Sequence, residues 1–99
     1  MPQSPFQTTS LSVANSRALN LTSATLVKGS HGFVVRVSVN ATSSTAGAIY
    51  DSATVAGAAS SNLIAVIPAT VGTYAIEFPA VNGIVVSPGT GQTVAVSYS

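Results

Sequence analysis

Six side chains of this 99-residue sequence can carry charge or exchange a proton near neutral pH: Arg17, Lys28, His31, Arg36, Asp51 and Glu77. The single histidine allows one nucleophilic arrangement, in which His31 is the base for a hydroxyl and Asp51 orients its ring. His31 lies in the glycine-flanked segment Lys28–Gly32, which is typical of an exposed turn. We therefore expect a solvent-exposed turn histidine. A hydrolase is the alternative, and it requires His31 within hydrogen-bond reach of Asp51 and a hydroxyl.

The two carboxylates, Asp51 and Glu77, are the minimum for acid/base hydrolysis of a glycoside. The sequence has three tyrosines and no tryptophan for stacking on a sugar, and nothing in it brings the two carboxylates together. We expect Asp51 to cap a turn after Ile49-Tyr50 and Glu77 to lie on the polar face of a strand, where either could pair with a basic residue. The sequence thus predicts no catalytic residue and a protein that is not an enzyme.

Cofactor, metal and nucleic-acid binding find little support in the composition. There is no cysteine, and no two potential metal ligands are neighbours in the sequence. The segment Gly89–Thr93 resembles a phosphate-binding loop only superficially, because the lysine and the following helix are missing. A net charge of +1 from three basic residues cannot supply the phosphate contacts on which nucleic-acid affinity depends. We expect no cofactor, no metal and no nucleic acid.

The pattern of apolar residues predicts strands. Alternation with period two occurs in Phe33–Asn40, Tyr74–Phe78 and Thr93–Tyr98. In the first of these, the residues expected on the apolar face are Phe33, Val35, Val37 and Val39. The run Asn62–Ile67 is apolar on both faces and predicts a strand buried on both sides. Ala53–Ala59 lacks a helical stripe and is interpreted as a short strand or a loop.

Turn signals separate the strands of the second half at regular intervals. Pro68–Gly72, Pro79–Gly83 and Pro88–Gly91 each begin with proline and end with glycine. Short strands at this spacing indicate an antiparallel sandwich or barrel. We predict an all-β fold: a single antiparallel β-sandwich, jelly-roll-like, with about eight short strands over residues 11–99.

Residues 1–10 are interpreted as an extended N-terminal arm. Proline, glutamine, serine and threonine surround one apolar residue, Phe6. Two interpretations stay open: an unstructured terminus, or an arm that becomes ordered on a partner with Phe6 as its anchor. The start has no basic and apolar leader, and the apolar run Leu63–Ile67 is far too short for a membrane helix. We expect synthesis in the cytoplasm and no membrane association.

The low charge itself predicts assembly. Charged residues make up 5% of the chain, against roughly 25% in ordinary domains. Edge strands are usually protected by charges, proline, bulges or coverage, and a net charge near zero favours association. We therefore expect the domain to work in an oligomer or a larger shell. Arg17, Lys28 and Arg36 are either scattered surface charges or a common face for an acidic partner.

Several stretches, taken in order, resemble small virion proteins of tailed bacteriophages. An I-Y-D strand, a G-x-Y-x-x-x-F strand and a closing V-x-V-x-Y strand recur in those proteins. The matching stretches, which fall between Lys28 and Ser99, are Ala46–Ser52, Leu63–Ile67, Gly72–Phe78, Gly83–Val86 and Gly91–Tyr98.

The resemblance implies a non-enzymatic component of a virus particle. Capsid decoration (cement) proteins are small β-sandwiches, commonly trimeric, that clamp neighbouring capsid subunits; tail and head-fibre proteins carry similar modules. The short chain favours a decoration protein on the capsid exterior, with the major capsid protein as partner and Phe6, Arg17, Lys28 and Arg36 at the interface. The alternative is a tail or head-fibre module that binds host-surface glycans, which would require exposed Tyr50, Tyr74 or Tyr98 grouped in a groove.

Overall fold

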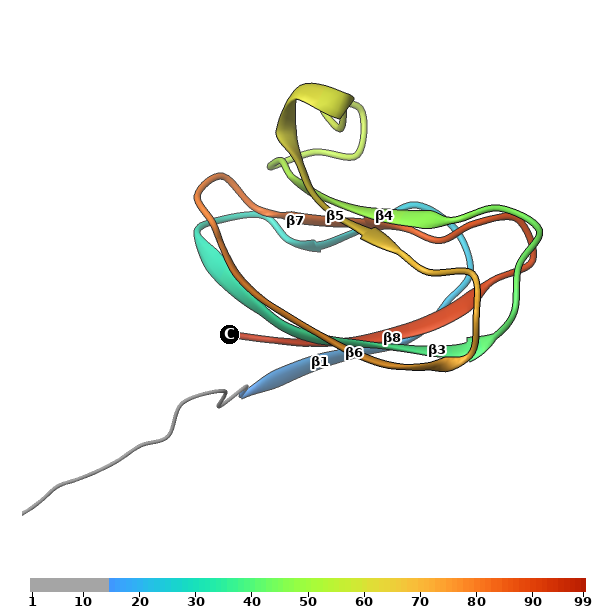
Figure 1. Ribbon diagram of the computed structural model, residues 1–99. Coiled ribbons are helices and arrows are strands. Elements are labelled where there is room, and N and C mark those ends of the chain that lie inside the picture. Colours follow the sequence, from blue (N-terminus) through green and yellow to red (C-terminus); the bar gives the residue numbers. More distant parts are fainter. Residues whose placement is uncertain (1–14) are drawn as a thin grey trace, which may run out of the picture.

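The computed structural model describes residues 15–99, which form eight strands in two four-stranded antiparallel sheets (Figure 1). The strands are β1 (Ser16–Leu21), β2 (Thr25–Lys28), β3 (Gly32–Ala41), β4 (Gly47–Asp51), β5 (Leu63–Ile67), β6 (Gly72–Ala80), β7 (Ile84–Ser87) and β8 (Thr93–Tyr98). A short 3₁₀ turn, η2 (Ser60–Asn62), precedes β5. The predicted arm, with Phe6, lies outside the described residues.

The order of the strands is that of a jelly roll. One sheet has the order β1-β8-β3-β6 and the other β2-β7-β4-β5. Every connection between consecutive strands crosses from one sheet to the other, except the one between β4 and β5, which are neighbours in the same sheet. This is the double-sheet arrangement of an eight-stranded jelly roll. The predicted all-β sandwich is confirmed.

The core is a layer of β-branched side chains between the two sheets. Both sheets contribute to it, and most of its members have no exposed surface. The buried cluster comprises Leu21, Val34, Val37, Val39, Ile49, Ile67, Ala80, Ile84, Val86, Val94 and Val96. Valine and isoleucine fit a pleated surface well, so a small domain without tryptophan can still close a continuous core.

The predicted faces of β3 are only partly correct. Val37 and Val39 point into the core as expected, but Val34, which was expected on the mixed face, belongs to the core as well. A register shift between Val34 and Arg36 explains the difference, since an irregularity in the ladder moves the alternation onto the other face. Val35 is buried but is not part of the inter-sheet cluster, and Phe33 is half-buried.

The prediction that Asn62–Ile67 is buried on both sides is wrong. β5 is the edge strand of its sheet, and Leu63 and Val66 are 42% and 58% exposed. Only Ile67 of this strand is fully buried. An apolar run shows only that a strand could be buried on both faces. Whether the strand is central or at an edge depends on its pairing with other strands, which the run does not determine.

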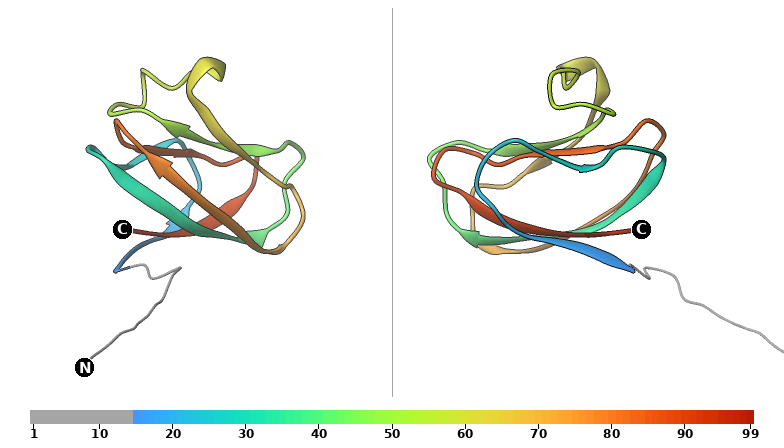
Figure 2. Two further views of the ribbon diagram at one scale, coloured as in Figure 1. Left: turned by 60° about the vertical axis from the view of Figure 1, so that its left-hand side comes forward. Right: turned by 180° about the vertical axis from the view of Figure 1, so that it is seen from behind.

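The connection between β4 and β5 is an exposed loop that projects from the sandwich (Figures 1 and 2). It contains Ala53–Ala59, so the loop interpretation is correct. The side chain of Asn62 holds the loop together: its Nδ2 donates to the Gly57 carbonyl oxygen, and its Oδ1 accepts from the Ala59 N–H, both at 2.9 Å. The loop therefore has its own hydrogen bonds although it packs little against the core.

At the opposite end of β4, a buried glutamine joins two loops. Gln92 is 1% exposed; its Oε1 accepts from the Gly89 N–H at 3.0 Å and its Nε2 donates to the Pro68 carbonyl oxygen at 2.9 Å. Gly47 allows this, because a Cβ atom there would lie 2.6 Å from Gln92 Oε1. The side chain thus satisfies polar groups at the ends of β5 and β7.

Each edge strand is irregular, a form of protection that the composition does not indicate. The edge strands are β1 and β6 in one sheet and β2 and β5 in the other, and each pairs with its neighbour through a register shift. Asn20 in β1 and Glu77 in β6 have φ values of 57° and 49°. Bulges bend an edge away from intermolecular pairing. Exposed apolar side chains, rather than open edges, therefore become the stronger argument for assembly.

Candidate functional site

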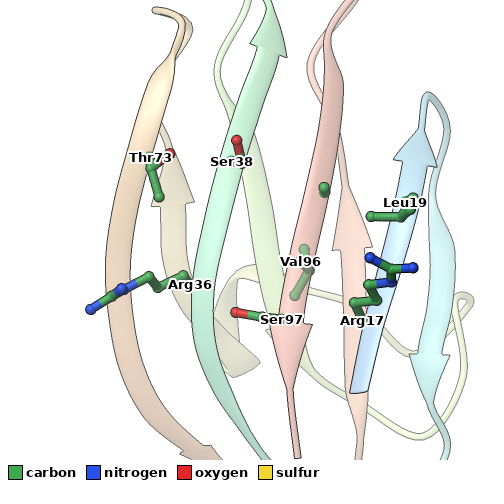
Figure 3. A pocket seen from close by; sticks show the side chains of 8 residues that line it. Arg17, Leu19, Arg36, Ser38, Thr73, Val96 and Ser97 are labelled. Carbon is green, nitrogen blue, oxygen red and sulfur yellow. The ribbon is translucent and has the colours of Figure 1, made fainter. Parts of the chain in front are cut away.

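Two of the three predicted basic contact residues lie on one sheet face. Arg17 on β1 and Arg36 on β3 are both paired in register with Ser97 of β8, which lies between those two strands. Because Ala18, Val37 and Val96 point into the core, the two arginines and Ser97 point to the outer face. Figure 3 shows them in one row across the sheet.

A shallow trough of about 270 Å³ runs over this face. Its floor is low because β8, the strand between β1 and β3, presents the small residues Ala95 and Ser97 outward. The walls are higher, since the flanking strands β1, β3 and β6 carry Arg17, Leu19, Arg36, Ser38 and Thr73. The lining is almost wholly apolar in its exposed atoms and contains no acidic residue. The trough is thus an apolar depression with a guanidinium group at either side.

Lys28 does not belong to this face. It lies at the end of β2, in the other sheet, and lines a separate depression with His31, Phe33 and Pro79. The structure therefore brings together Arg17 and Arg36 of the predicted interface and places Lys28 elsewhere. Phe6 lies outside the described residues.

Asp51 caps a turn, but not the one that was predicted. Its carboxylate accepts three backbone N–H groups of the turn between β6 and β7: Oδ2 from Val81 at 3.1 Å, and Oδ1 from Asn82 at 2.7 Å and Gly83 at 3.3 Å. Desolvation by itself raises the pKa of Asp51, but these hydrogen bonds outweigh it and hold the pKa below its ordinary value. The carboxylate is therefore engaged in joining β4 to a turn remote in sequence.

The geometry that the hydrolase alternative needs is not found in residues 15–99. No hydrogen bond joins His31 to Asp51 or to a hydroxyl there, and His31 is exposed in the turn between β2 and β3. Glu77, the other carboxylate, is an exposed residue of the edge strand β6. Within the same residues, no group of three or more histidine, cysteine, aspartate or glutamate side chains could hold a metal ion.

The tyrosines do not form the groove that a glycan-binding module would need. Tyr74 and Tyr98 pack against the core, and the Tyr74 hydroxyl donates to the Thr70 carbonyl oxygen at 2.7 Å. Tyr50 is half-buried on β4, in the other sheet. Aromatic stacking on a sugar therefore has no shared surface among these three residues.

Comparison with known proteins gives no relative. No protein-family model matches the chain, and neither the curated proteins nor the solved structures contain a significant match. In the part of the chain that the structure describes, no helix is both long and apolar enough to cross a membrane.

The trough itself could not be predicted from the sequence. Arg17, Arg36 and Ser97 are far apart in the chain, and only the pairing of β1 and β3 with β8 makes them neighbours. A usable signal was the small outward pair Ala95 and Ser97 in an otherwise apolar strand, which predicts a low place on the face if the strand is central.

Proposed function

We propose that this chain is a capsid decoration protein of a tailed bacteriophage, a non-enzymatic component that binds the major capsid protein and stabilises the shell from outside. The likeness of Lys28–Ser99 to small virion proteins supports the phage assignment. The jelly-roll topology agrees with it, since viral capsid domains use this architecture. Lectins and other proteins share the fold, so the fold alone does not decide the function.

The observation that carries the proposal is the face of the sheet β1-β8-β3-β6. It presents Arg17 and Arg36 around a trough without any acidic residue. Such a face suits an acidic protein surface, because complementary charge guides association and fixes register. Assembly would bury apolar area at roughly 25 cal/mol per Å², less the free energy lost in association. Copies of the chain would also contact one another, with a trimer favoured by the resemblance.

The test is co-sedimentation of the purified protein with capsid shells of the phage that carries its gene. We expect wild-type protein to bind and the double variant Arg17→Glu/Arg36→Glu to lose about tenfold or more in affinity, because two favourable charges become repulsive. Lys28→Glu, a single charge reversal outside the face, is the control. If the wild-type protein stays in the supernatant, the proposed function as a capsid decoration protein is contradicted. Equal binding by all three proteins contradicts the proposal that this face is the contact surface.

The positions of the tyrosines do not support the glycan-binding alternative. It needs an aromatic groove, and the three tyrosines are divided between two sheets, with two of them packed on the core.

A further inference from the structure

The trough lies beside the point where the N-terminal segment joins the sheet. A depression lined by Asn15, Ser16, Arg17 and Ser97 adjoins it, and the last two of these residues also line the trough. Asn15, which directly precedes β1, therefore lies beside the row that Arg17, Ser97 and Arg36 form. Residues 1–14 directly precede Asn15 in the sequence.

The floor of the trough favours an apolar side chain, while Arg17 and Arg36 stand at its sides. Its exposed lining is almost wholly apolar, and the hydroxyls of Ser38, Thr73 and Ser97 are its only neutral polar side-chain groups. An apolar side chain placed on this floor would remove it from water. The sequence of residues 1–14 contains no aspartate, glutamate, lysine or arginine, and its largest apolar residue is Phe6.

The length of the segment is sufficient. Eight residues lie between Phe6 and Asn15, and at up to about 3.3 Å per residue an extended chain spans roughly 30 Å between the two. Along β1 the trough extends from Arg17 to Leu19, only a few residues from Asn15. The entropy of closing so short a loop is small, and docking on the same chain therefore has an advantage over docking on a second copy.

We propose that Phe6 packs into the trough of its own chain, over Ala95 and against Leu19, so that the N-terminal segment folds back across the outer face of the sheet β1-β8-β3-β6. Arg17 and Arg36 stay at the rims of the filled trough. The two parts of the interface predicted from sequence, the arm and the arginines, then belong to one surface. This inference concerns the isolated protein and does not depend on the proposed virion function.

The test uses the full chain with Phe6→Trp as a reporter, which works because the natural sequence has no tryptophan. We expect the emission of the introduced tryptophan to shift to shorter wavelength, and its quenching by acrylamide to fall, relative to a peptide of residues 1–14 with the same substitution. Adding Ala95→Ile fills the trough with a side chain that suits a strand, and both effects should be lost. Adding Ala48→Ile is the matched control, because Ala48 points outward from β4 in the other sheet. Both effects should then remain.

Leu19→Ser provides a second disrupting variant in case Ala95→Ile does not fold. Leu19 is 57% exposed on an edge strand, so its replacement removes one wall of the trough with little effect on the core. We expect it to reduce the shift in emission. Emission equal to that of the peptide overturns the proposal, as does a shift that survives both trough variants. A shift that disappears on dilution also overturns it and identifies a second copy as the occupant.

Discussion

At the scale of single residues, Asp51 is the polar side chain with the most evident structural role. Its carboxylate joins the end of β4 to three N–H groups of the turn between β6 and β7. We expect Asp51→Asn to lower the free energy of unfolding at neutral pH by about 1–2 kcal/mol, because charge-assisted hydrogen bonds are lost from a partly exposed site. Urea unfolding monitored by circular dichroism measures the change.

The pH dependence gives this prediction a direction. Backbone hydrogen bonds hold the pKa of Asp51 below its ordinary value in the folded state, so the stabilisation is complete above the pKa of the unfolded chain. It is lost as the pH falls through the folded pKa, on the acid side of the usual aspartate range. The stabilities of wild type and Asp51→Asn should therefore converge in acid. If the difference in unfolding free energy between the two proteins stays constant from neutral pH into acid, the ionised Asp51 carboxylate does not stabilise the turn.

At the scale of strands, the sequence predicted which segments form strands better than it predicted where those strands lie in the two sheets. Period-two alternation identified the strands around Val37, Tyr74 and Val96, because one face of each must be buried. The alternation failed at Val34, where a register shift decides the outcome, and the apolar run Asn62–Ile67 misled at Val66, which lies on an edge strand. Those features arise from pairings between distant segments, and neither composition nor periodicity records them.

The candidate site shows the same limit. Arg17 and Arg36 were predicted as surface contacts, but their common row depends on the registers of two ladders with β8. Lys28, the third basic residue of the predicted interface, falls in the other sheet. The sequence shows that these three residues are basic, but it does not show which of them lie on the same face of the sandwich.

The irregularity in β1 leads to a prediction about the edge. Asn20 has a φ of 57°, in the left-handed region that asparagine tolerates and β-branched residues avoid. Asn20→Val should cost roughly 1–2 kcal/mol of stability, or straighten the edge and increase aggregation. Asn20→Gly is the control, since glycine keeps this conformation without strain. Thermal unfolding combined with light scattering measures both effects. Equal behaviour of the two variants would mean that the bulge does not protect this edge.

At the scale of the whole molecule, the exposed apolar side chains are unevenly distributed. Within residues 15–99, eight large hydrophobic residues are exposed, and five of them belong to β5, β6 and the adjoining loops. These five are Leu63, Val66, Val71, Phe78 and Val81. β5 and β6 are the edge strands of their two sheets and contact each other, so they form one side of the sandwich (Figure 1). Apolar surface gathered on one side is typical of an interaction surface.

If the protein assembles as its low charge predicts, this side is where copies should meet. Val66 and Val81 are 58% and 67% exposed, so a lysine at either position adds charge without disturbing the core. We expect wild-type protein to associate in sedimentation velocity experiments and Val66→Lys/Val81→Lys to shift the distribution towards monomer. Leu26→Lys, on the edge strand β2 and 40% exposed, adds the same kind of charge away from β5 and β6 and should leave association unchanged. A wild-type protein that stays monomeric as its concentration rises would contradict self-assembly. A loss of association in Leu26→Lys as large as in the double variant would mean that added charge, and not this side of the sandwich, controls it.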